Sequence, residues 1–324
     1  MQKICVNMEY LILILSLAGI VLGADFLVKG AVVVARKCRV SSFVIGAVIV
    51  GIGTSLPELV VSTVGAIGGN SEVAIGNVVG SNIFNVFAIL GLTALFFPIA
   101  VSRENMKFEI PFCIAVSILL MLLVYNFFIV GEPRLGRWDG AALLLVFTSF
   151  MWISLRRGKS SAATVGESVE EENKSLWFAA FSILGGLAAL IVSSNFFVDE
   201  AVAIARKLGV SDAFISITLL ACGTSLPELA ASVTAAVKKD TDMALGNIIG
   251  SNIFNVTMIL GTASLITPLT TGKIGLVDYG AMILAAVLPM IFGIRGKITR
   301  FEGLLMLLCY AAYTWYIVTY VMAV

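Results

Sequence analysis

The two halves of this chain carry the same two motifs at a fixed separation of 170 residues. The motif GTSLPEL occupies residues 53–59 and returns at residues 223–229, and GSNIFNV occupies residues 80–86 and returns at residues 250–256. The same offset relates Pro98 to Pro268. Matches without gaps over this distance do not arise by chance, so we interpret the chain as a duplication of one structural unit.

Long apolar runs predict that both units lie in a membrane. A helix needs about 20 apolar residues to cross about 30 Å of hydrocarbon, and the chain is 59% hydrophobic and only 13% charged. Ten runs of suitable length occur, at residues 10–35, 43–66, 74–97, 108–130, 138–155, 176–205, 213–237, 244–266, 277–294 and 301–321. The sequence therefore predicts an all-α, multi-pass protein of the cell membrane. We expect an N-terminal repeat at residues 1–157, a polar linker at 158–175 and a C-terminal repeat at 176–324.

The number of spans in each repeat predicts their relative orientation. Five is odd, so the second repeat enters the membrane from the side opposite to the first, which makes the repeats inverted. Of the 21 Lys and Arg residues, Lys29 lies within a predicted span. Fourteen of the others lie in segments on the same side of the membrane as the linker, and six lie on the opposite side. Basic residues accumulate on the cytoplasmic side. This asymmetry predicts a cytoplasmic linker and both termini outside.

Glu58 and Glu228 are the candidate functional residues with the strongest signal. Each acid is expected at the centre of an apolar span, where an ionised carboxylate costs at least about 2.5 kcal/mol unless it is compensated. No Lys or Arg occurs at a matching depth in either span. Acids in such positions usually mark ion or proton pathways. We therefore interpret them as cation ligands.

The residues before each acid predict additional oxygen ligands. Pro57 and Pro227 lack an N–H and break the helix, which frees carbonyl groups of the preceding turn. Freed carbonyls survive at membrane depth only where they are buried in protein or line a cavity. Two bidentate glutamates and the carbonyls of Thr54 and Thr224 would supply six oxygens, within the range of about six to eight that Ca2+ takes. Two carboxylates also neutralise Ca2+.

The third and eighth spans supply a second duplicated set of small and polar residues. Gly76 and Gly80 are four apart, as are Gly246 and Gly250, and this spacing favours close helix packing. Ser81 and Asn85 share a helix face, as do Ser251 and Asn255, so we predict that these four residues are ligands. In the first span, Asp25 and Lys29 are also four apart and can pair, and we interpret them as polar residues that reach the membrane surface.

The duplicated motifs closely resemble the two alpha repeats of the cation/calcium exchanger superfamily, with the prokaryotic sodium/calcium exchanger branch nearest. The resemblance covers the first three spans of each half. It implies ten transmembrane helices, alternating access by sliding of the first and sixth helices, and exchange of three Na+ for one Ca2+. By motif match, the implied Ca2+ ligands are Glu58, Glu228, Thr54 and Thr224. The implied Na+ ligands are Ser55, Ser225, Ser81, Ser251, Asn85 and Asn255, with carbonyls near Gly51 and Ala221.

One departure from the family pattern concerns the number of acids. Many relatives carry Asp at one of the positions equivalent to Asn85 and Asn255, and this chain has Asn at both. That difference leaves two carboxylates at the site and argues against the potassium-dependent branch.

Other function classes are less consistent with these features. A proton-coupled Ca2+ exchanger is the main alternative, because a buried glutamate can also carry H+. A passive Ca2+ channel could present two carboxylates, but inverted repeats with broken helices favour a transporter. A structural or lipid-binding protein would not need a duplicated ligand set. The chain has no Walker-type nucleotide loop and a net charge of only +1. We therefore expect no enzymatic activity, no cofactor and no nucleic-acid partner, and no protein partner is evident. The expected partners are the lipid bilayer and the transported ions Ca2+ and Na+.

Overall fold

The computed structural model describes residues 2–125, 133–158, 174–208 and 221–321, and it is predominantly helical. The elements of the first half are α1 (Gln2–Cys38), α2 (Ser42–Ile45), η1 (Gly46–Val50), α3 (Gly51–Thr54), α4 (Leu56–Ile67), α5 (Ser71–Phe84), η2 (Asn85–Leu90), α6 (Gly91–Phe96), β1 (Ile99–Ala100), η3 (Asn105–Glu109), α7 (Ile110–Tyr125), β2 (Arg134–Leu135) and α8 (Arg137–Gly158). Those of the second half are α9 (Leu176–Lys207), α11 (Ala221–Gly223), α12 (Leu226–Val237), α13 (Thr241–Phe254), η7 (Asn255–Ile259), α14 (Leu260–Ile266), β3 (Leu269–Thr270), α15 (Leu276–Gly293), β4 (Lys297–Ile298), α16 (Arg300–Tyr316) and η8 (Ile317–Val321). Segments labelled η are π-helical turns.

The helices have the length and hydropathy of membrane spans. In the described part of the chain, eight helices are long and apolar enough to cross a membrane, and a ninth is counted when the bent pair Ser42–Thr54 and Leu56–Ile67 is taken as one span. α12 is a shorter apolar helix, and the beginning of the span predicted at 213–237 lies outside the described residues. The prediction of a multi-pass helical membrane protein is confirmed.

The predicted break in the second span is present. The two parts of the span meet at Ser55 and are bent by 47° relative to each other. Pro57 lies in the first turn of α4, where its missing N–H costs no helical hydrogen bond. In the other half, α12 begins at Leu226 with Pro227 at the equivalent position.

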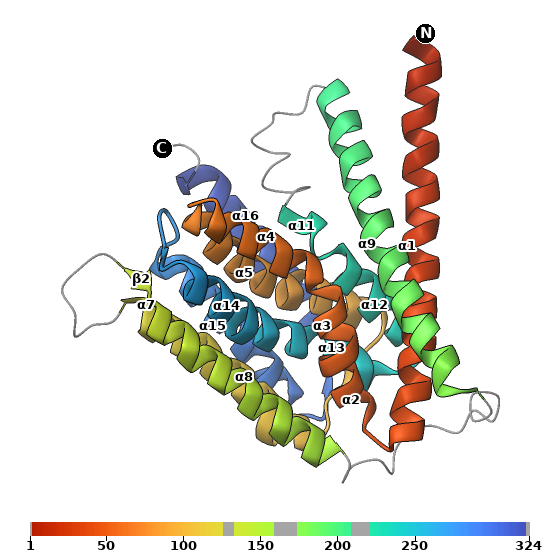
Figure 1. Cartoon of the computed structure of the whole chain (residues 1–324). Coiled ribbons are helices and arrows are strands. Elements are labelled where there is room, and N and C mark those ends of the chain that lie inside the picture. The colour runs from red at the N-terminus through yellow and green to blue at the C-terminus, as the bar shows by residue number, and fades with distance from the viewer. Residues whose placement is uncertain (1, 126–132, 159–173, 209–220, 322–324) are drawn as a thin grey trace.

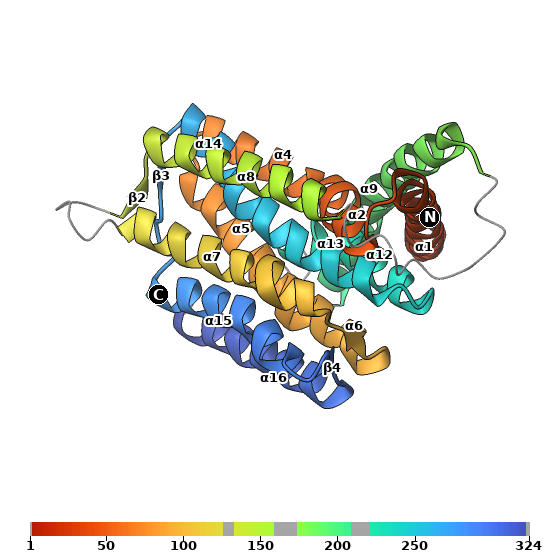
Figure 2. The same ribbon diagram turned by 90° about the horizontal axis from the view of Figure 1, so that it is seen from below.

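Two helices from different halves form the centre of the molecule. α5 and α13 lie between a layer that contains α4, α14 and α8 and a layer that contains α7, α15 and α16 (Figure 2). α1 and α9 pack along each other at one edge (Figure 1) and reach the rest mainly through contacts of α1 with α12. The central position of α5 and α13 explains why their motifs contain so many small and amide side chains.

Short strands connect the two halves reciprocally. β1 of the first half pairs antiparallel with β4 of the second, which places Ile99 opposite Ile298. β2 of the first half pairs antiparallel with β3 of the second, which places Leu135 opposite Leu269. β1 and β3 are 170 residues apart in the sequence. Equivalent strands of the two halves therefore each pair with a strand of the other half.

Candidate cation-binding site

Both predicted acids lie where a broken helix starts again. Glu58 is in the first turn of α4 and Glu228 is in the first turn of α12, and both side chains are fully buried. The N–H groups of a first helical turn carry partial positive charge, which favours a carboxylate at that position. The break that the sequence predicted therefore does more than free carbonyl oxygens. It also lowers the cost of keeping the two glutamates ionised.

Each carboxylate accepts a hydrogen bond from the serine of the other motif copy. Ser55 Oγ donates to Glu228 Oε1 at 2.8 Å, and Ser225 Oγ donates to Glu58 Oε1 at 2.9 Å. The second oxygen of each carboxylate, Oε2, is buried without a hydrogen-bond partner. Among the described residues, no Lys or Arg forms an ion pair with either acid. Two acidic groups, each with one free oxygen, therefore lie in the protein interior, and a bound cation would stabilise their charged forms.

The predicted polar residues of the central helices are buried as well. Ser81 and Asn85 follow each other along α5 and η2, and Ser251 and Asn255 do so along α13 and η7. Each asparagine is the first residue of a π-helical turn, a distortion that often accompanies functional sites. Asn85 Oδ1, Asn255 Oδ1 and Ser81 Oγ have no partner, whereas Ser251 Oγ donates to the Gly51 carbonyl at 3.2 Å.

The two predicted threonines differ from each other. Thr54 Oγ1 lies 3.3 Å from both the Gly51 carbonyl and Asn247 Oδ1. Thr224 Oγ1 is buried without a hydrogen-bond partner. Gly51 begins α3, and Ala221 is the first described residue of α11.

The buried atoms of the predicted site residues that lack a hydrogen-bond partner have one chemistry in common. They are all oxygens, namely those of Glu58, Glu228, Asn85, Asn255, Ser81 and Thr224. The described residues contain no cluster of three or more His, Cys, Asp or Glu side chains spaced to hold a metal ion. A centre with two carboxylates and otherwise neutral oxygens suits hard cations such as Na+ and Ca2+ and disfavours soft transition metals.

The predicted close packing is present for one of the two glycine pairs. A Cβ on Gly246 would overlap the Phe43 carbonyl, and one on Gly250 would overlap the backbone of Ala47. Among the described residues, a Cβ on Gly76 would meet the Ile274 side chain at 3.3 Å and one on Gly80 would meet nothing within 4 Å, and both glycines line a cavity of about 180 Å³ between α5, α15 and α16. The counterparts of Phe43 and Ala47, at positions 213 and 217, lie outside the described part of the chain. Close packing is therefore confirmed at α13 and stays a prediction at α5.

Sequence reasoning missed four asparagines that connect the site. Asn77 Nδ2 donates to the Glu58 carbonyl at 3.3 Å and to a serine hydroxyl of α4, and Asn247 Nδ2 makes the equivalent bonds to the Glu228 carbonyl at 3.2 Å and to α12. Asn82 and Asn252 bond each other across the centre. Asn82 and Asn252 lie inside the duplicated motifs, and Asn77 and Asn247 lie three residues before them at the same offset of 170. An amide that repeats at equivalent positions of two apolar spans is the signal that could have identified all four.

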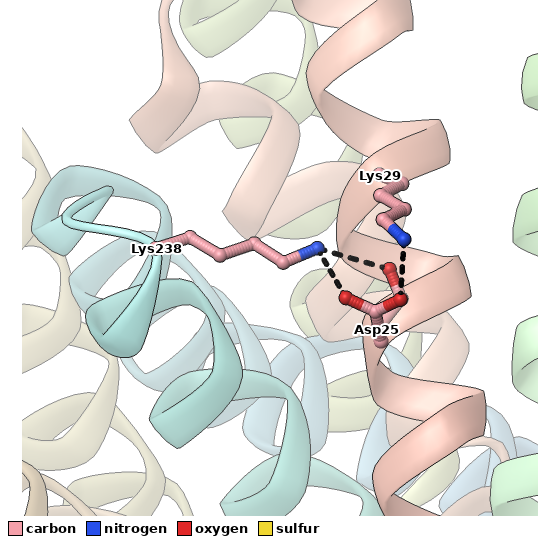
Figure 3. A network of polar contacts seen from close by, with 3 residues as sticks. All are labelled: Asp25, Lys29 and Lys238. Carbon is pink, nitrogen blue, oxygen red and sulfur yellow. Dashed lines mark hydrogen bonds and ion pairs between the residues drawn. The ribbon is translucent and has the colours of Figure 1, made fainter.

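The predicted pair in α1 is present and has a third member. Lys29 Nζ and Lys238 Nζ each lie 2.7 Å from an oxygen of Asp25 (Figure 3). Lys238 Nζ also donates to the Asp25 carbonyl at 3.2 Å. Lys238 follows α12 directly, so the network ties α1 to the helix that carries Glu228.

Comparisons with known proteins agree with this chemistry. The family described as sodium/calcium exchanger protein matches residues 8–156 and 178–319. The chain is 34% identical to the sodium/calcium exchanger MaX1 of Methanosarcina acetivorans over 95% of this chain and 98% of that protein. It is 36% identical to the putative antiporter CaxA of Alkalimonas amylolytica over 93% and 96% of the two chains. A solved structure of the sodium-calcium exchanger NCX_Mj, soaked with Na+ and without Ca2+, superposes with a TM-score of 0.82 at 32% identity and covers 97% of this chain and 99% of that one.

Proposed function

This chain belongs to the sodium/calcium exchanger family, whose members are transporters and not enzymes, and we propose that it exchanges Ca2+ for Na+ across the cell membrane as a secondary antiporter. One observation carries the proposal. Two fully buried carboxylates from two copies of one motif each accept a bond from the other copy's serine and keep one oxygen free. Such a pair binds and neutralises one divalent cation, or holds several monovalent ones in its place.

We assign the ligands by their chemistry and position. Ca2+ takes the carboxylates of Glu58 and Glu228 with oxygens of Thr54 and Thr224. Na+ takes the same carboxylates together with neutral oxygens of Ser55, Ser225, Ser81, Ser251, Asn85 and Asn255 and with carbonyls near Gly51 and Ala221. The buried, unpartnered oxygens of Glu58, Glu228, Ser81, Asn85, Asn255 and Thr224 support this assignment.

The chain crosses the membrane ten times in this proposal, as two inverted repeats of five spans at residues 1–157 and 176–324 that a cytoplasmic linker at 158–175 joins. The reciprocal strand pairs and serine–glutamate bonds between residues of the two halves support it. Both termini lie outside. Single cysteines at Ser102 and Lys273 in a cysteine-free background test this orientation with an impermeant thiol reagent on intact cells. Labelling at Lys273 and protection at Ser102 are expected, and the reverse pattern would invert the topology.

Alternating access is the proposed mechanism, in which the site opens to one side of the membrane at a time. α13 is packed against α2 and η1 through Gly246 and Gly250. In the orientation proposed above, this packed face lies toward the cytoplasm. The described conformation would then be closed to the cytoplasm at this face, and the transport cycle would open it.

The coupling is proposed as three Na+ for one Ca2+. Ca2+ on two carboxylates is electrically neutral, whereas three Na+ leave one positive charge to cross the membrane. One elementary charge feels about 2.3 kcal/mol per 100 mV, so the membrane potential is expected to change the exchange rate or its equilibrium.

Sealed proteoliposomes test the function directly. Vesicles loaded with Na+ are placed in Ca2+-containing medium while a K+ ionophore sets the potential, and Ca2+ uptake is followed. We expect uptake that requires the outward Na+ gradient, does not need K+ as a substrate and increases when the interior is made positive, since three Na+ that leave as one Ca2+ enters carry one net positive charge outward. Uptake that ignores Na+ and follows a pH gradient would instead establish proton coupling. Uptake that is driven by Na+ but does not depend on voltage would support Na+/Ca2+ exchange and reject the ratio of three to one. The ratio would then be two Na+ per Ca2+, which moves no net charge.

A further inference from the structure

Four asparagine side chains meet at the centre of the molecule, where α5 and α13 cross. We call Asn82, Asn85, Asn252 and Asn255 the asparagine cluster. Asn82 Nδ2 donates to the Asn252 carbonyl at 3.0 Å, and Asn252 Nδ2 donates to the Asn82 carbonyl at 3.1 Å. Asn85 Nδ2 donates to Asn252 Oδ1, and Asn255 Nδ2 donates to Asn82 Oδ1, both at 3.0 Å. All four side chains are buried.

The hydrogen bonds determine which end of each amide faces which neighbour. A backbone carbonyl can only accept, so Asn82 and Asn252 must present their NH2 groups to each other's main chain. Their Oδ1 atoms then face the other way and accept from Asn255 and Asn85. As a result, Asn85 and Asn255 use their NH2 groups in the cluster. Their Oδ1 atoms are left buried and without a hydrogen-bond partner.

We propose that Asn82 and Asn252 are positioning residues that fix Asn255 and Asn85 as oxygen ligands for Na+. The proposal deepens the exchange function above and rests on its assignment of Asn85 and Asn255 to the Na+ sites. Each positioning residue acts on the ligand of the other half: Asn82 orients Asn255, and Asn252 orients Asn85. Without this constraint either ligand amide can rotate by half a turn and present NH2 hydrogens, which repel a cation.

The crossed arrangement distinguishes positioning from plain core packing. Asn82 and Asn85 are one helical turn apart in the same half, yet no bond between their side chains appears among those of the cluster. A residue that only stabilised α5 would affect Asn85 and Asn255 alike and would alter the binding of Na+ and Ca2+ together. A positioning residue would act on Na+ binding through one specific partner.

Double-mutant cycles measured by Na+ binding provide the test. Purified full-length protein is titrated with Na+ in the absence of Ca2+, and the rise of its unfolding temperature reports the affinity, because a ligand that binds only the native state stabilises it. The variants are Asn82→Ala, Asn255→Ala, Asn85→Ala and the doubles Asn82→Ala/Asn255→Ala and Asn82→Ala/Asn85→Ala. Ser117→Ala, which removes another buried hydrogen bond, in α7, is the control.

We expect Asn82→Ala to weaken Na+ binding by about 3- to 10-fold, the equivalent of one hydrogen bond, and to change Ca2+ binding less. Once Asn255 is Ala, Asn82→Ala should have little further effect on Na+, whereas its effect should add to that of Asn85→Ala. Asn252→Ala is the second variant if Asn82→Ala folds poorly: its effect on Na+ binding should nearly vanish once Asn85 is Ala and should add to that of Asn255→Ala.

Three results would overturn the proposal. They are additive effects of Asn82→Ala and Asn255→Ala, equal losses of Na+ and Ca2+ binding, or additive effects of Asn252→Ala and Asn85→Ala. Wild-type flux in proteoliposomes is measured in parallel and reports on the exchange function separately. A wild-type protein that is stabilised by Na+ but does not exchange it for Ca2+ would reject the proposed function and leave the positioning test valid.

Discussion

Glu58 and Glu228 combine three residue-level conditions that rarely occur together. They are fully buried, they lie in the first turn of a helix, and each keeps one oxygen without a partner. Burial alone would favour the protonated form, but the helix N-terminus and the serine hydroxyl both favour the charged form. A cation bound to the free oxygen of each acid would add to these two interactions and stabilise the charged form further.

Removal of either charge should therefore abolish Ca2+ binding. Glu58→Gln and Glu228→Gln keep the size of the side chain but replace a charged bidentate ligand by a neutral one with a single oxygen. We expect each variant to weaken Ca2+ binding by at least about 100-fold, since loss of one partner of a buried charge interaction costs about 3 kcal/mol or more. Isothermal titration with Ca2+ measures this.

The matched control for these variants is Asp199→Asn, which removes the same charge from an exposed position on α9. Its Ca2+ affinity should equal that of the unmodified protein. If Glu58→Gln or Glu228→Gln binds Ca2+ with unchanged affinity, the assignment of that acid is wrong.

At the scale of elements, α5 and α13 have nearly the same motif. Gly250 of α13 is in backbone contact with Ala47 of η1. The counterpart of Ala47 in the second half is Ile217, which lies outside the described residues. Sequence spacing predicted close packing for both helices; it is confirmed for α13 and stays a prediction for α5.

The contacts of Gly250 predict a cost for an added methyl group. Gly250→Ala should destabilise the protein by about 1–3 kcal/mol through overpacking. Gly80→Ala is the matched variant: an equal loss would show that the α5 face is packed in the same way, whereas a neutral effect or a gain of up to about 1 kcal/mol, because alanine is the better helix former, would show that it is not. Thermal unfolding in detergent compares the two variants.

Transport should separate these variants a second time. If the cycle packs the Gly80 face in its other conformation, Gly80→Ala should slow Ca2+ flux although the protein remains stable. A Gly80→Ala protein with full stability and unchanged flux would argue against a conformation in which that face is packed.

At the scale of the whole molecule, the bonds between the halves are close to symmetric, but the network around Asp25 is not. The residues equivalent to Asp25 and Lys238 are Asn195 and Gly68, which cannot form an ion pair. Asp25 and Lys238 therefore stabilise the described position of α1 against α12. If transport follows the alternating access proposed above, the opposite conformation has no corresponding ion pair, and the two conformations should differ in free energy for this reason.

Lys238→Gln should shift the population toward the opposite conformation by about two- to fivefold, the value of a partly exposed ion pair. Spin labels at the exposed positions Leu15 on α1 and Leu145 on α8 report the two populations as two distances. Lys29→Gln removes a lysine from the same carboxylate without changing the bond between helices, so it should leave the populations unchanged. Equal shifts in both variants would show that the charge of Asp25, and not its link to α12, is responsible.

Much of this protein follows from the sequence alone. Apolar runs of membrane length predicted the helices, because a backbone in lipid must satisfy its own hydrogen bonds. Pro57 and Pro227 predicted the helix breaks, and the acids beside them predicted the position of the site. These features depend on local chemistry, which a linear sequence contains in full. The beginning of the span predicted at 213–237 remains a prediction, because part of it lies outside the described residues.

Other features are decided only by the tertiary structure. The sequence does not show that Ser55 binds Glu228 or that Asn82 orients Asn255, because these partners are 173 residues apart in the chain and meet only when both halves are packed. Nor does it show that α13 packs against η1 through Gly250. The duplicated motifs carry nearly the same information in each half, because each describes only its own helix. Which residues of one half meet which residues of the other is decided by the packing of the complete molecule.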